Sequence, residues 1–530
     1  MNFDVVIIGS GAGGGMTALS LCEQGFKVCV LERGKQFDPR KDFILNHADW
    51  ENREDPLKEA NLKEQTINQQ FRTKIEVDGI KEFRTPLRYH RVHGVGGSTL
   101  HYQGEAHRFP THAFNNRQIF GWGTDWPINY SDLAPYYQQA EHLLGVAGET
   151  GNPFKVDRGE FPTPAHTLSK RSQVLAKSAK EIGMSLLPNT LALPSISIDG
   201  RTPCQHSGGC NFGCIFGAKS SIDQAIIPRA EKTGNLTLLS ETRALKLELD
   251  RKGNIQAVEC QSTIRDFKIT AKAYVLATGA IETPRLMLHS SYANNNDQVG
   301  RYFMETVIAS LALELEADFQ TFRGPPLDSR VWDFSKPENE NISGYVLGNS
   351  GYLYPAIGPS SHAITSQGIG RQHKHAVRSS FGRNVQLFGI AEQEPVSSNR
   401  VTLSKYFDDM GIPKVDVNCA YSERDLHTIS EMNNKLQKWA EATPTKSIGL
   451  ASDSRYRSSA THVGGTCRMG SDPKHSVVDA FGKVHKQSNC YITDASVFVT
   501  QGAGDSPSLT IQALALRTAD KIANDLKLSK

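Results

Sequence analysis

The sequence predicts an α/β protein with two domains, one built on a parallel sheet and one on a second sheet of α+β character. Residues 4–34 and 273–290 each have the pattern of a strand, a small-residue turn and a helix. Between about 300 and 455, alternating apolar and polar residues predict further strands. At 530 residues, the chain is long enough for two domains that each bury a full core.

The first element is a βαβ unit over residues 4–34. An apolar strand leads into GSGAGGG, followed by a small-residue helix and a strand that ends at Glu32. Gly9, Gly11 and Gly14 give GxGxxG, which allows a tight turn, close approach to a pyrophosphate and helix–strand packing. Glu32 is placed to accept hydrogen bonds from ribose hydroxyls. The unit therefore predicts a dinucleotide site rather than a purely structural turn.

The next elements lead away from this unit and return to it. Residues 40–90 are polar and poorly periodic, which suggests a lid-like excursion, and a second glycine-rich loop follows at 91–109. Ser131 is the expected N-cap of a helix that carries Pro135 in its first turn. Strands are expected again from about residue 235.

The second half adds strands, one helix near 422–441, and a final strand, loop and amphipathic helix. Ser508 is the expected cap of that last helix. We find no internal repeat and no low-complexity linker.

Composition narrows the class of protein. Lys and Arg outnumber Asp and Glu by 59 to 56 with no concentrated basic block, which argues against nucleic acid as partner. No stretch approaches the roughly eighteen apolar residues of a membrane helix, so no membrane span is expected. The start MNFDVVIIG leaves no room for a signal peptide, and nine cysteines suit a reducing compartment. We expect a cytoplasmic chain, or a periplasmic one if it is exported folded with a partner that has a signal.

A cysteine cluster raises the question of a metal centre. CQHSGGCNFGC places Cys204, Cys210 and Cys214 within eleven positions, separated by glycines that let a short loop wrap around a compact centre. A disulfide would leave one thiol unpaired, and zinc would need a fourth ligand such as His206. From the residues alone, a disulfide, core packing, zinc and an iron–sulfur cluster lacking one iron stay open.

The sequence resembles the glucose-methanol-choline (GMC) flavin oxidoreductases nearly end to end. The motifs that carry the resemblance are GSGAGGG with Glu32, GVGGSTLHYQG, ATGAIETPRLML, THVGGTCRMG and DASVFVTQGAGDSPSLTIQALALRTA. DWPINYSDLAPYYQQAE, EPVSSNRVTL and the cysteines look most like the catalytic subunits of bacterial FAD-dependent gluconate, glucose and related sugar dehydrogenases. The resemblance implies a GMC-type fold, with a Rossmann-like FAD-binding domain and a sheet-based substrate domain.

The order of the motifs suggests that each domain is assembled from separate segments. We expect the FAD-binding domain in residues 1–130, 201–300 with the cysteine loop, and 456–530 with the catalytic C-terminal segment. The substrate domain is expected in residues 131–200 and 301–455.

The resemblance implies FAD rather than NAD as the cofactor. The residues implied to hold its ADP half are Gly9, Gly11, Gly14, Glu32 and the backbone of Ala244. Those implied along the flavin, ribityl and pyrophosphate are Gly97, Ser98, Gly279, Asp494 and Ala495, although Asp494 could be an ordinary loop acid. His101 matches a histidine that binds the flavin covalently in some relatives, and a covalent bond, a hydrogen bond and a packed imidazole stay open.

Oxidising an alcohol requires a base for the hydroxyl proton and an acceptor for the hydride. His462 in THVGGTCRMG matches the family's catalytic histidine, and imidazole suits this proton transfer. The family usually has Asn or His where this chain has Ser506, which can still donate and accept a hydrogen bond over a shorter reach. This departure leaves open that His462 acts with Asp505, or that the alignment slips by one residue.

The leading interpretation is an FAD-dependent dehydrogenase of a sugar, polyol or sugar acid. The resemblance implies that Cys204, Cys210 and Cys214 bind a [3Fe-4S] cluster that passes electrons to a partner, with a cytochrome and a small companion subunit as expected partners. The alternatives are an oxidase or dehydrogenase of aliphatic or sterol alcohols, a flavin-dependent lyase on the same fold, and, most remotely, a binding module.

Overall fold

A computed structural model gives the fold over most of the chain. It describes residues 3–43, 71–77, 80–82, 88–89, 92–156, 159–351, 366, 368–454 and 459–528.

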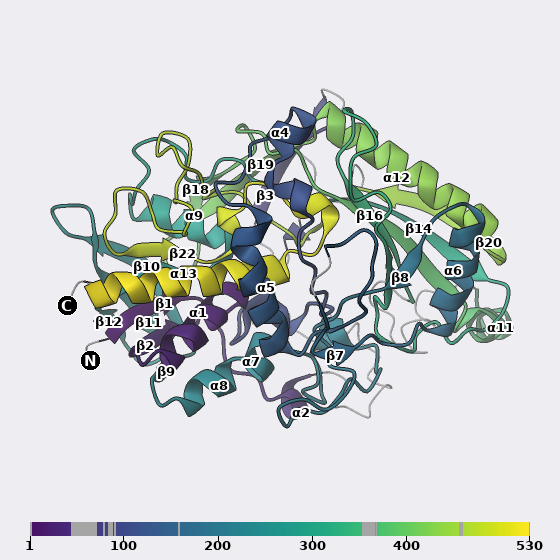
Figure 1. Ribbon diagram of the computed structural model, residues 1–530, viewed down its shortest axis with the longest axis horizontal. Coiled ribbons are helices and arrows are strands. Elements are labelled where there is room, and N and C mark those ends of the chain that lie inside the picture. The colour runs from purple at the N-terminus through teal and green to yellow at the C-terminus, as the bar shows by residue number, and fades with distance from the viewer. Residues whose placement is uncertain are drawn as a thin grey trace.

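One sheet is entirely parallel and contains strands from both ends of the chain (Figure 1). Its central strand, β1 (Phe3–Ile8), has the sequence FDVVII and is almost wholly buried, as expected for a strand covered on both faces. The strands in spatial order are β22 (Cys490–Ile492), β13 (Ala271–Leu276), β1, β2 (Val28–Leu31) and β9 (Leu236–Leu239). This sheet confirms the predicted Rossmann-like part of the fold.

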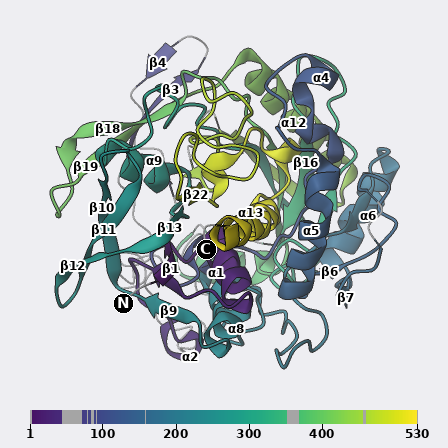
Figure 2. The same cartoon turned by 60° about the vertical axis from the view of Figure 1, so that its left-hand side comes forward.

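Helices follow the strands of this sheet as the sequence predicts. α1 (Ala12–Glu23) follows β1, and α9 (Gly279–His289) follows β13 in the segment 273–290. α13 (Ser508–Leu528) packs against both α1 and α5 (Tyr130–Leu144). Figure 2 shows α13 almost end-on beside α1. The C-terminal helix therefore covers the same sheet that the N-terminal strand begins.

A second sheet of six antiparallel strands forms the core of the other half of the molecule (Figure 1). α12 (Glu423–Ala442) lies across it and buries Met432, Leu436 and Trp439 against the strands. The strands in spatial order are β20 (Thr445–Asp453), β14 (Val307–Leu315), β17 (Asn384–Ala391), β16 (Tyr345–Ser350), β15 (Ser329–Val331) and β8 (Leu186–Pro188). The sheet-based second half and its helix near 422–441 are thus confirmed.

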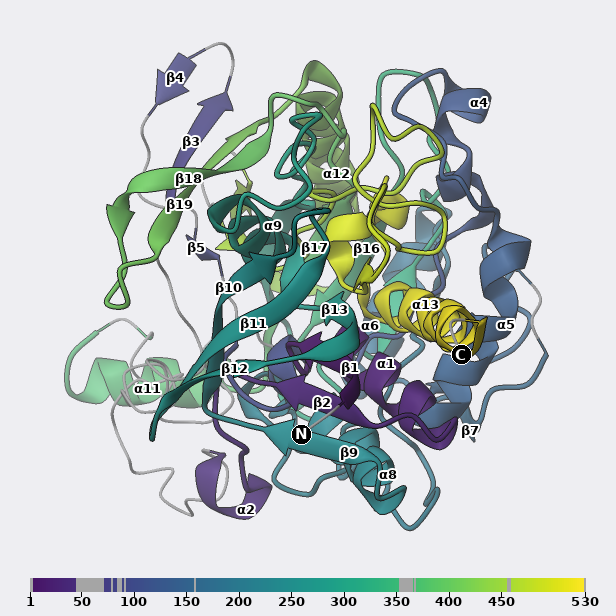
Figure 3. The ribbon, with the colours of Figure 1, turned by 90° about the vertical axis from the view of Figure 1, so that its left-hand side faces the viewer.

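Two smaller sheets lie on the side shown in Figure 3. One contains β10 (Thr242–Leu249), β11 (Ile255–Ser262) and β12 (Asp266–Ile269), and the other contains β18 (Arg400–Phe407), β19 (Pro413–Ala420), β3 (Phe71–Val77) and β4 (Ile80–Glu82). Most of the predicted lid-like excursion at 40–90 lies outside the described residues.

The remaining elements connect these sheets or flank them. They are α2 (Pro39–Asp42), β5 (Arg88–Tyr89), η2 (Gly97–Leu100), η3 (Thr111–Phe114), α4 (Asn116–Phe120), β6 (Ala147–Gly148), β7 (Thr163–Pro164), α6 (Lys170–Glu181), η4 (Cys210–Phe212), α7 (Ile222–Ala225), α8 (Ile227–Lys232), α11 (Arg371–Ser380), β21 (Ser459–Ala460), η5 (Ala495–Val497) and η6 (Gly502–Gly504).

Two predicted helix starts are corrected by the structure. The N-cap of α5 is Asn129 rather than Ser131, because Asn129 and Asp132 form a capping box in which each side chain bonds the other's backbone N–H. Ser508 is the first residue of α13 and not its cap. Across the described ranges, no helix combines the length and apolar character needed to cross a membrane.

Candidate active site

The glycine turn after β1 forms an open cradle. Gly9 has φ of 99°, which favours glycine, and a Cβ atom at Gly14 would lie 1.9 Å from the carbonyl oxygen of Gly9. A Cβ atom at Gly11 would meet no neighbouring atom closer than 3.9 Å. Gly9 and Gly14 therefore shape the turn, and the space beside Gly11 is left for a ligand.

A second glycine loop lies against the first. In η2, Gly97 has φ of 54°, and its Cβ atom would lie 2.8 Å from the Cα atom of Gly11. Ser98, the next residue, is exposed. The structure thus brings together Gly11, Gly97 and Ser98, which the sequence places in two separate motifs.

A buried carboxylate beside this loop fits a ligand that carries hydroxyl groups. Asp223 is 7% exposed, and its Oδ1 has no hydrogen-bond partner within the described part of the chain. A Cβ atom at Gly96 would lie 3.2 Å from that oxygen. Buried polar atoms are normally paired, and the hydroxyls of a dinucleotide could supply the missing partner. The residues present therefore fit FAD.

Glu32, which directly follows β2, is hydrogen-bonded to the glycine turn. Its Oε2 accepts hydrogen bonds from the N–H and hydroxyl of Ser10 at 3.1 and 2.7 Å, and its Oε1 accepts one from the N–H of Gly34 at 3.0 Å. Burial raises the pKa of Glu32. β10, which contains Ala244, starts beside it, since the N–H of Thr242 donates to the Glu32 carbonyl at 2.8 Å. Contact of Glu32 and Ala244 with the adenosine half stays a prediction.

Asp494 joins the C-terminal motif to the segment that begins α9. Its Oδ2 accepts hydrogen bonds from the N–H of Gly279 at 2.9 Å and the hydroxyl of Thr283 at 2.5 Å. Its Oδ1 accepts one from the N–H of Ser496 at 2.8 Å. Asp494, Ala495 and Gly279 therefore lie together, and both oxygens of Asp494 hold the protein segments to each other.

His462 is held from two sides. Its carbonyl oxygen accepts a hydrogen bond from Nε2 of Gln501 at 2.5 Å, and its Nδ1 lies 3.4 Å from Oγ1 of Thr306. Burial lowers the pKa of His462 to about 4, although the charge of Glu105 opposes this shift. The imidazole is therefore neutral near physiological pH, and a neutral imidazole can accept a proton.

Asp505 and Ser506, which lie just before α13, differ in role. The backbone N–H of Ser506 donates to Nδ1 of His107 at 3.1 Å. Asp505 is fully buried, pairs with the ammonium of Lys155 and accepts the indole N–H of Trp332 at 3.0 Å. Burial raises the pKa of Asp505, but Lys155 and His107 hold it well below its usual range. Asp505 is thus an ionised carboxylate already engaged by a cation, and the catalytic role of Ser506 stays a prediction.

A cleft of about 770 Å³ adjoins this network. His107, Lys155 and Trp332 form part of its wall, and Tyr130 and Phe161 add aromatic surface. Its volume lies in the range typical of small-molecule sites.

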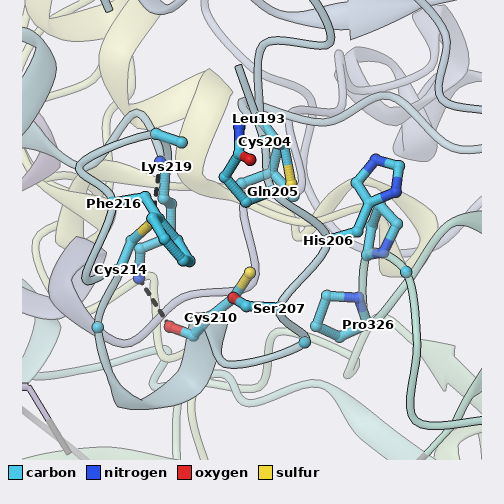
Figure 4. Close-up of a pocket in the computed structure, with 15 residues that line it drawn as sticks. Leu193, Cys204, Gln205, His206, Ser207, Cys210, Cys214, Phe216, Lys219 and Pro326 are labelled. Carbon is cyan, nitrogen blue, oxygen red and sulfur yellow. Dashed lines mark hydrogen bonds between the residues drawn. The ribbon is translucent and has the colours of Figure 1, made fainter. Parts of the chain in front are cut away.

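The three clustered cysteines line one small pocket (Figure 4). Cys204, Cys210 and Cys214 are free thiols, and the volume between them is about 10 Å³, or room for about one water molecule. His206, weighed as a zinc ligand, lies 3.2 Å from the ring of His166. Among the residues that the structure describes, no group of three or more His, Cys, Asp or Glu side chains could hold a metal ion.

A buried lysine ties this pocket to the second glycine loop. Nζ of Lys219 donates to the carbonyl oxygens of Leu100, Tyr102 and Cys210 at 2.7, 3.1 and 2.8 Å. Its backbone N–H donates to Sγ of Cys214 at 3.5 Å. The cysteine loop and the glycine loop are therefore fixed relative to each other by one cation.

His101 links the same two loops. Its Nδ1 lies 2.6 Å from the carbonyl oxygen of Asn211, so this nitrogen carries the proton that is donated. A covalent bond to flavin would therefore form at Nε2. Covalent attachment of the flavin at His101 stays a prediction.

Sequence reasoning missed several groups that surround the predicted residues. Thr306, Lys155 and Trp332 reach the site from segments far away in the chain, and no motif marks them. Asp223 and Glu305 do carry a weak signal, because each is a single acid in an apolar run, SSIDQAII and YFMETVIASL. An unpaired acid in such a run indicates a buried carboxyl group that needs a partner.

Comparisons with known proteins cover almost the whole chain. Residues 87–307 and 395–515 match sequence models described as GMC oxidoreductase, and residues 4–40 match one described as an FAD binding domain. The chain is 29% identical to the 6'''-hydroxyparomomycin C oxidase of Streptomyces lividus, covering 99% of this chain and 92% of that protein. It is 27% identical to the fructose dehydrogenase large subunit of Gluconobacter japonicus, covering 99% of each. A solved structure of formate oxidase is similar in fold, with a TM-score of 0.71, 14% identity, and coverage of 100% of this chain and 99% of that one.

Proposed function

Because the chain belongs to the GMC oxidoreductases and is an FAD-dependent enzyme acting on CH–OH groups, we propose that it is a dehydrogenase of a sugar, polyol or sugar acid. The names of two relatives support this substrate class, since one acts on fructose and the other on 6'''-hydroxyparomomycin C. The cleft of about 770 Å³ beside the network of His107 and Lys155 has room for a molecule of that size.

His462 carries the proposal, because it is a neutral imidazole in a largely buried position. With a pKa lowered to about 4, it accepts the proton of the substrate hydroxyl at a ring nitrogen. The hydroxyl of Ser506 donates a hydrogen bond to the substrate oxygen and fixes its orientation. When bound on the Gly9–Gly14 turn and against Gly97, FAD supplies the acceptor for the hydride.

Anaerobic titration of the purified protein tests this function. Sugars or polyols should bleach the yellow flavin without oxygen, whereas aliphatic and sterol alcohols should not. Bleaching by a sterol but by no sugar would move the enzyme to the alternative substrate class. If no alcohol bleaches the flavin, the proposal is contradicted and the flavin-dependent lyase is the remaining alternative.

We further propose that Cys204, Cys210 and Cys214 hold a [3Fe-4S] cluster, which when bound accepts single electrons for transfer to a partner. Three thiols around one pocket suit this donor set in kind, and residues 205–207 beside them are exposed. A cytochrome and a small companion subunit are the proposed partners. The relative from Gluconobacter japonicus is a large subunit, which supports the companion subunit.

Iron content tests the cluster. Protein prepared without oxygen should contain about three irons per chain and absorb beyond the flavin bands. Cys210→Ser should lose iron and electron transfer to the partner while substrate still reduces the flavin, and Cys260→Ser, in a buried strand, is the control. Iron-free protein that passes electrons at full rate would refute the cluster.

Acid precipitation tests the state of His101. If the flavin is not attached, the supernatant is yellow. If the pellet keeps the colour and His101→Ala releases it, the flavin is attached at this residue.

A further inference from the structure

The segment before β14 runs beside the segment that carries His462. The N–H of Met304 donates to the carbonyl of Gly464 at 3.1 Å, and the N–H of Gly464 donates back at 3.0 Å. This antiparallel pairing places Glu305 and Thr306 next to the imidazole. Glu305 and Thr306 are only 4% and 2% exposed, so water competes little for their polar atoms.

Three groups form a chain of contacts that ends at the imidazole. Oε1 of Glu305 lies 3.5 Å from Oγ1 of Thr306, and Oγ1 lies 3.4 Å from Nδ1 of His462. Oε1 of Glu305 also accepts the N–H of Thr461 at 3.1 Å, which holds the carboxyl group in place. The two longer contacts suit a site that tightens when it binds its ligand.

The direction of the hydrogen bonds from Glu305 through Thr306 determines which ring nitrogen of His462 is protonated. An ionised carboxylate can only accept, so the hydroxyl of Thr306 donates its hydrogen to Glu305. The lone pair of that hydroxyl then accepts a hydrogen bond from Nδ1–H of His462. Nε2 is left without a proton and is the nitrogen that can act as a base.

We propose that Glu305, acting through Thr306, is a positioning residue that fixes the tautomer of His462 and so makes Nε2 the proton acceptor. The inference rests on the proposed role of His462 and adds two residues to it. A carboxylate that orients a histidine through its other nitrogen is an arrangement known to matter greatly for catalysis.

This arrangement gives the reaction a pH dependence at a higher pH than the one at which His462 itself titrates. Burial raises the pKa of Glu305 to about 8. Below that pH Glu305 is protonated and can donate to Thr306, whose hydroxyl then donates to Nδ1. The proton of the imidazole then lies on Nε2, and the base is lost. The rate of flavin reduction should therefore rise with pH through about 8.

The other groups that face Glu305 do not titrate there. Its N–H donates to Oε1 of Gln393 at 2.9 Å. Cys419 of β19 and Tyr421 also interact with its charge, and burial raises the pKa of Cys419 to about 12 and that of Tyr421 well above its usual value.

Glu105, Arg330 and His107 act electrostatically on His462. Glu105 and Arg330 pair at 2.5 Å. Burial raises the pKa of Glu105, but the charge of Arg330 and the other partners of this carboxylate together outweigh burial and lower the pKa. This carboxylate therefore stays ionised at neutral pH.

Stopped-flow measurement of anaerobic flavin reduction against pH tests the inference. The wild type should show the rise near pH 8, and Glu305→Gln should abolish it. Thr306→Val should slow reduction at least about tenfold at high pH with FAD still bound, and Thr306→Ser should restore it. Asp333→Asn, which removes another acid whose pKa is raised by burial, is the control and should keep the rise. A rise that persists in Glu305→Gln, or wild-type rates in Thr306→Val, would overturn the inference.

A second readout does not require turnover. ¹⁵N shifts of the His462 imidazole, assigned by comparison with His462→Gln, should show a protonated Nδ1 above pH 8 that is lost in Thr306→Val. The same tautomer in both proteins would overturn the inference. Failure of alcohol oxidation would appear differently, as wild-type flavin that no alcohol reduces.

Discussion

Burial determines the protonation of His462, and with it the ability of this residue to take a proton. Its surroundings lower its pKa to about 4. A histidine in water is partly protonated near pH 6.5. The protein therefore keeps the imidazole uncharged over a pH range in which a free histidine becomes protonated.

Replacing His462 with alanine removes the proton acceptor without altering the glycine cradle. We expect His462→Ala to keep its FAD and to slow reduction by substrate about a hundredfold or more, the usual scale for loss of a positioned base. Anaerobic stopped-flow spectroscopy measures the rate. His475→Ala, at a side chain that is 73% exposed, is the control and should behave as the wild type. An undiminished rate in His462→Ala would remove this residue from the mechanism.

Ser506 and Asp505 should respond differently to substitution. Ser506→Ala is expected to slow flavin reduction less than His462→Ala and to leave the thermal midpoint unchanged. Asp505→Asn leaves the ammonium of Lys155, which is 15% exposed, without its counter-ion, so it should destabilise the fold by about 3 kcal/mol or more. Differential scanning fluorimetry measures the midpoints. A stable Asp505→Asn with strongly reduced catalysis would instead place Asp505 among the reacting groups.

Motif spacing locates the residues that are expected to face the cofactor but not those that support them. Gly11, Gly97, Asp494 and His462 lie in motifs whose glycines or small residues can be read directly. Lys155 meets Asp505 across 350 positions, and Thr306 meets His462 across 156. Such contacts depend on how whole strands are packed, and no local pattern encodes them.

The glycine turn between β1 and α1 combines a structural task with a predicted binding task in one short element. Substituting Gly14 would force a Cβ atom to within 1.9 Å of a carbonyl oxygen and so disturb the turn, whereas Gly11 faces open space. The two positions can therefore separate folding from binding.

Gly11→Val should give a folded protein without flavin. The side chain points into the space beside the turn, where the nearest neighbouring atom to its Cβ lies 3.9 Å away, and occupies volume that a pyrophosphate needs. Flavin absorbance after purification and circular dichroism give the two readouts, and Gly11→Ala should show an intermediate loss. Normal flavin content in Gly11→Val would contradict the assignment of this turn to the cofactor.

Element boundaries were harder to predict than element types. The sequence predicts helices in the regions of α5, α9 and α12, and the structure contains all three. The start of α5 was misplaced because Asn129 and Ser131 are both good caps two positions apart. With Asn129 as the cap, the side chains of Asn129 and Asp132 both form capping hydrogen bonds, and this pair determines where α5 begins.

The strands of the parallel sheet come from distant parts of the chain, so the predicted cofactor site depends on all of them. Its five strands come from residues 3–8, 28–31, 236–239, 271–276 and 490–492. The sequence predicts strands in these segments. The relative placement of the substrate half cannot be read from the motifs, because it depends on packing between segments that carry no motif.

Cofactor removal should therefore affect the molecule as a unit. Gly97 lies against Gly11, and a Cβ atom at Gly13 would lie 1.6 Å from the carbonyl oxygen of Thr493, so FAD bound here should stabilise contacts among all three segments. Stripping the flavin should lower the thermal midpoint, and excess FAD should restore it, with about 2.7 kcal/mol gained at one hundred times the Kd. Gly11→Val should show no such recovery. Equal midpoints with and without FAD would argue against a cradle that spans the chain.

The position of β22 has a consequence for biosynthesis. This strand completes the parallel sheet beside β13, yet it is synthesised after the other four strands of that sheet, and Asp494, Ser506 and α13 follow it. Although domains tend to fold in the order of their synthesis, β13 must wait with one edge unpaired until β22 has left the ribosome. A nascent chain stalled before residue 490 should therefore present that edge to chaperones, and we expect it to bind no flavin.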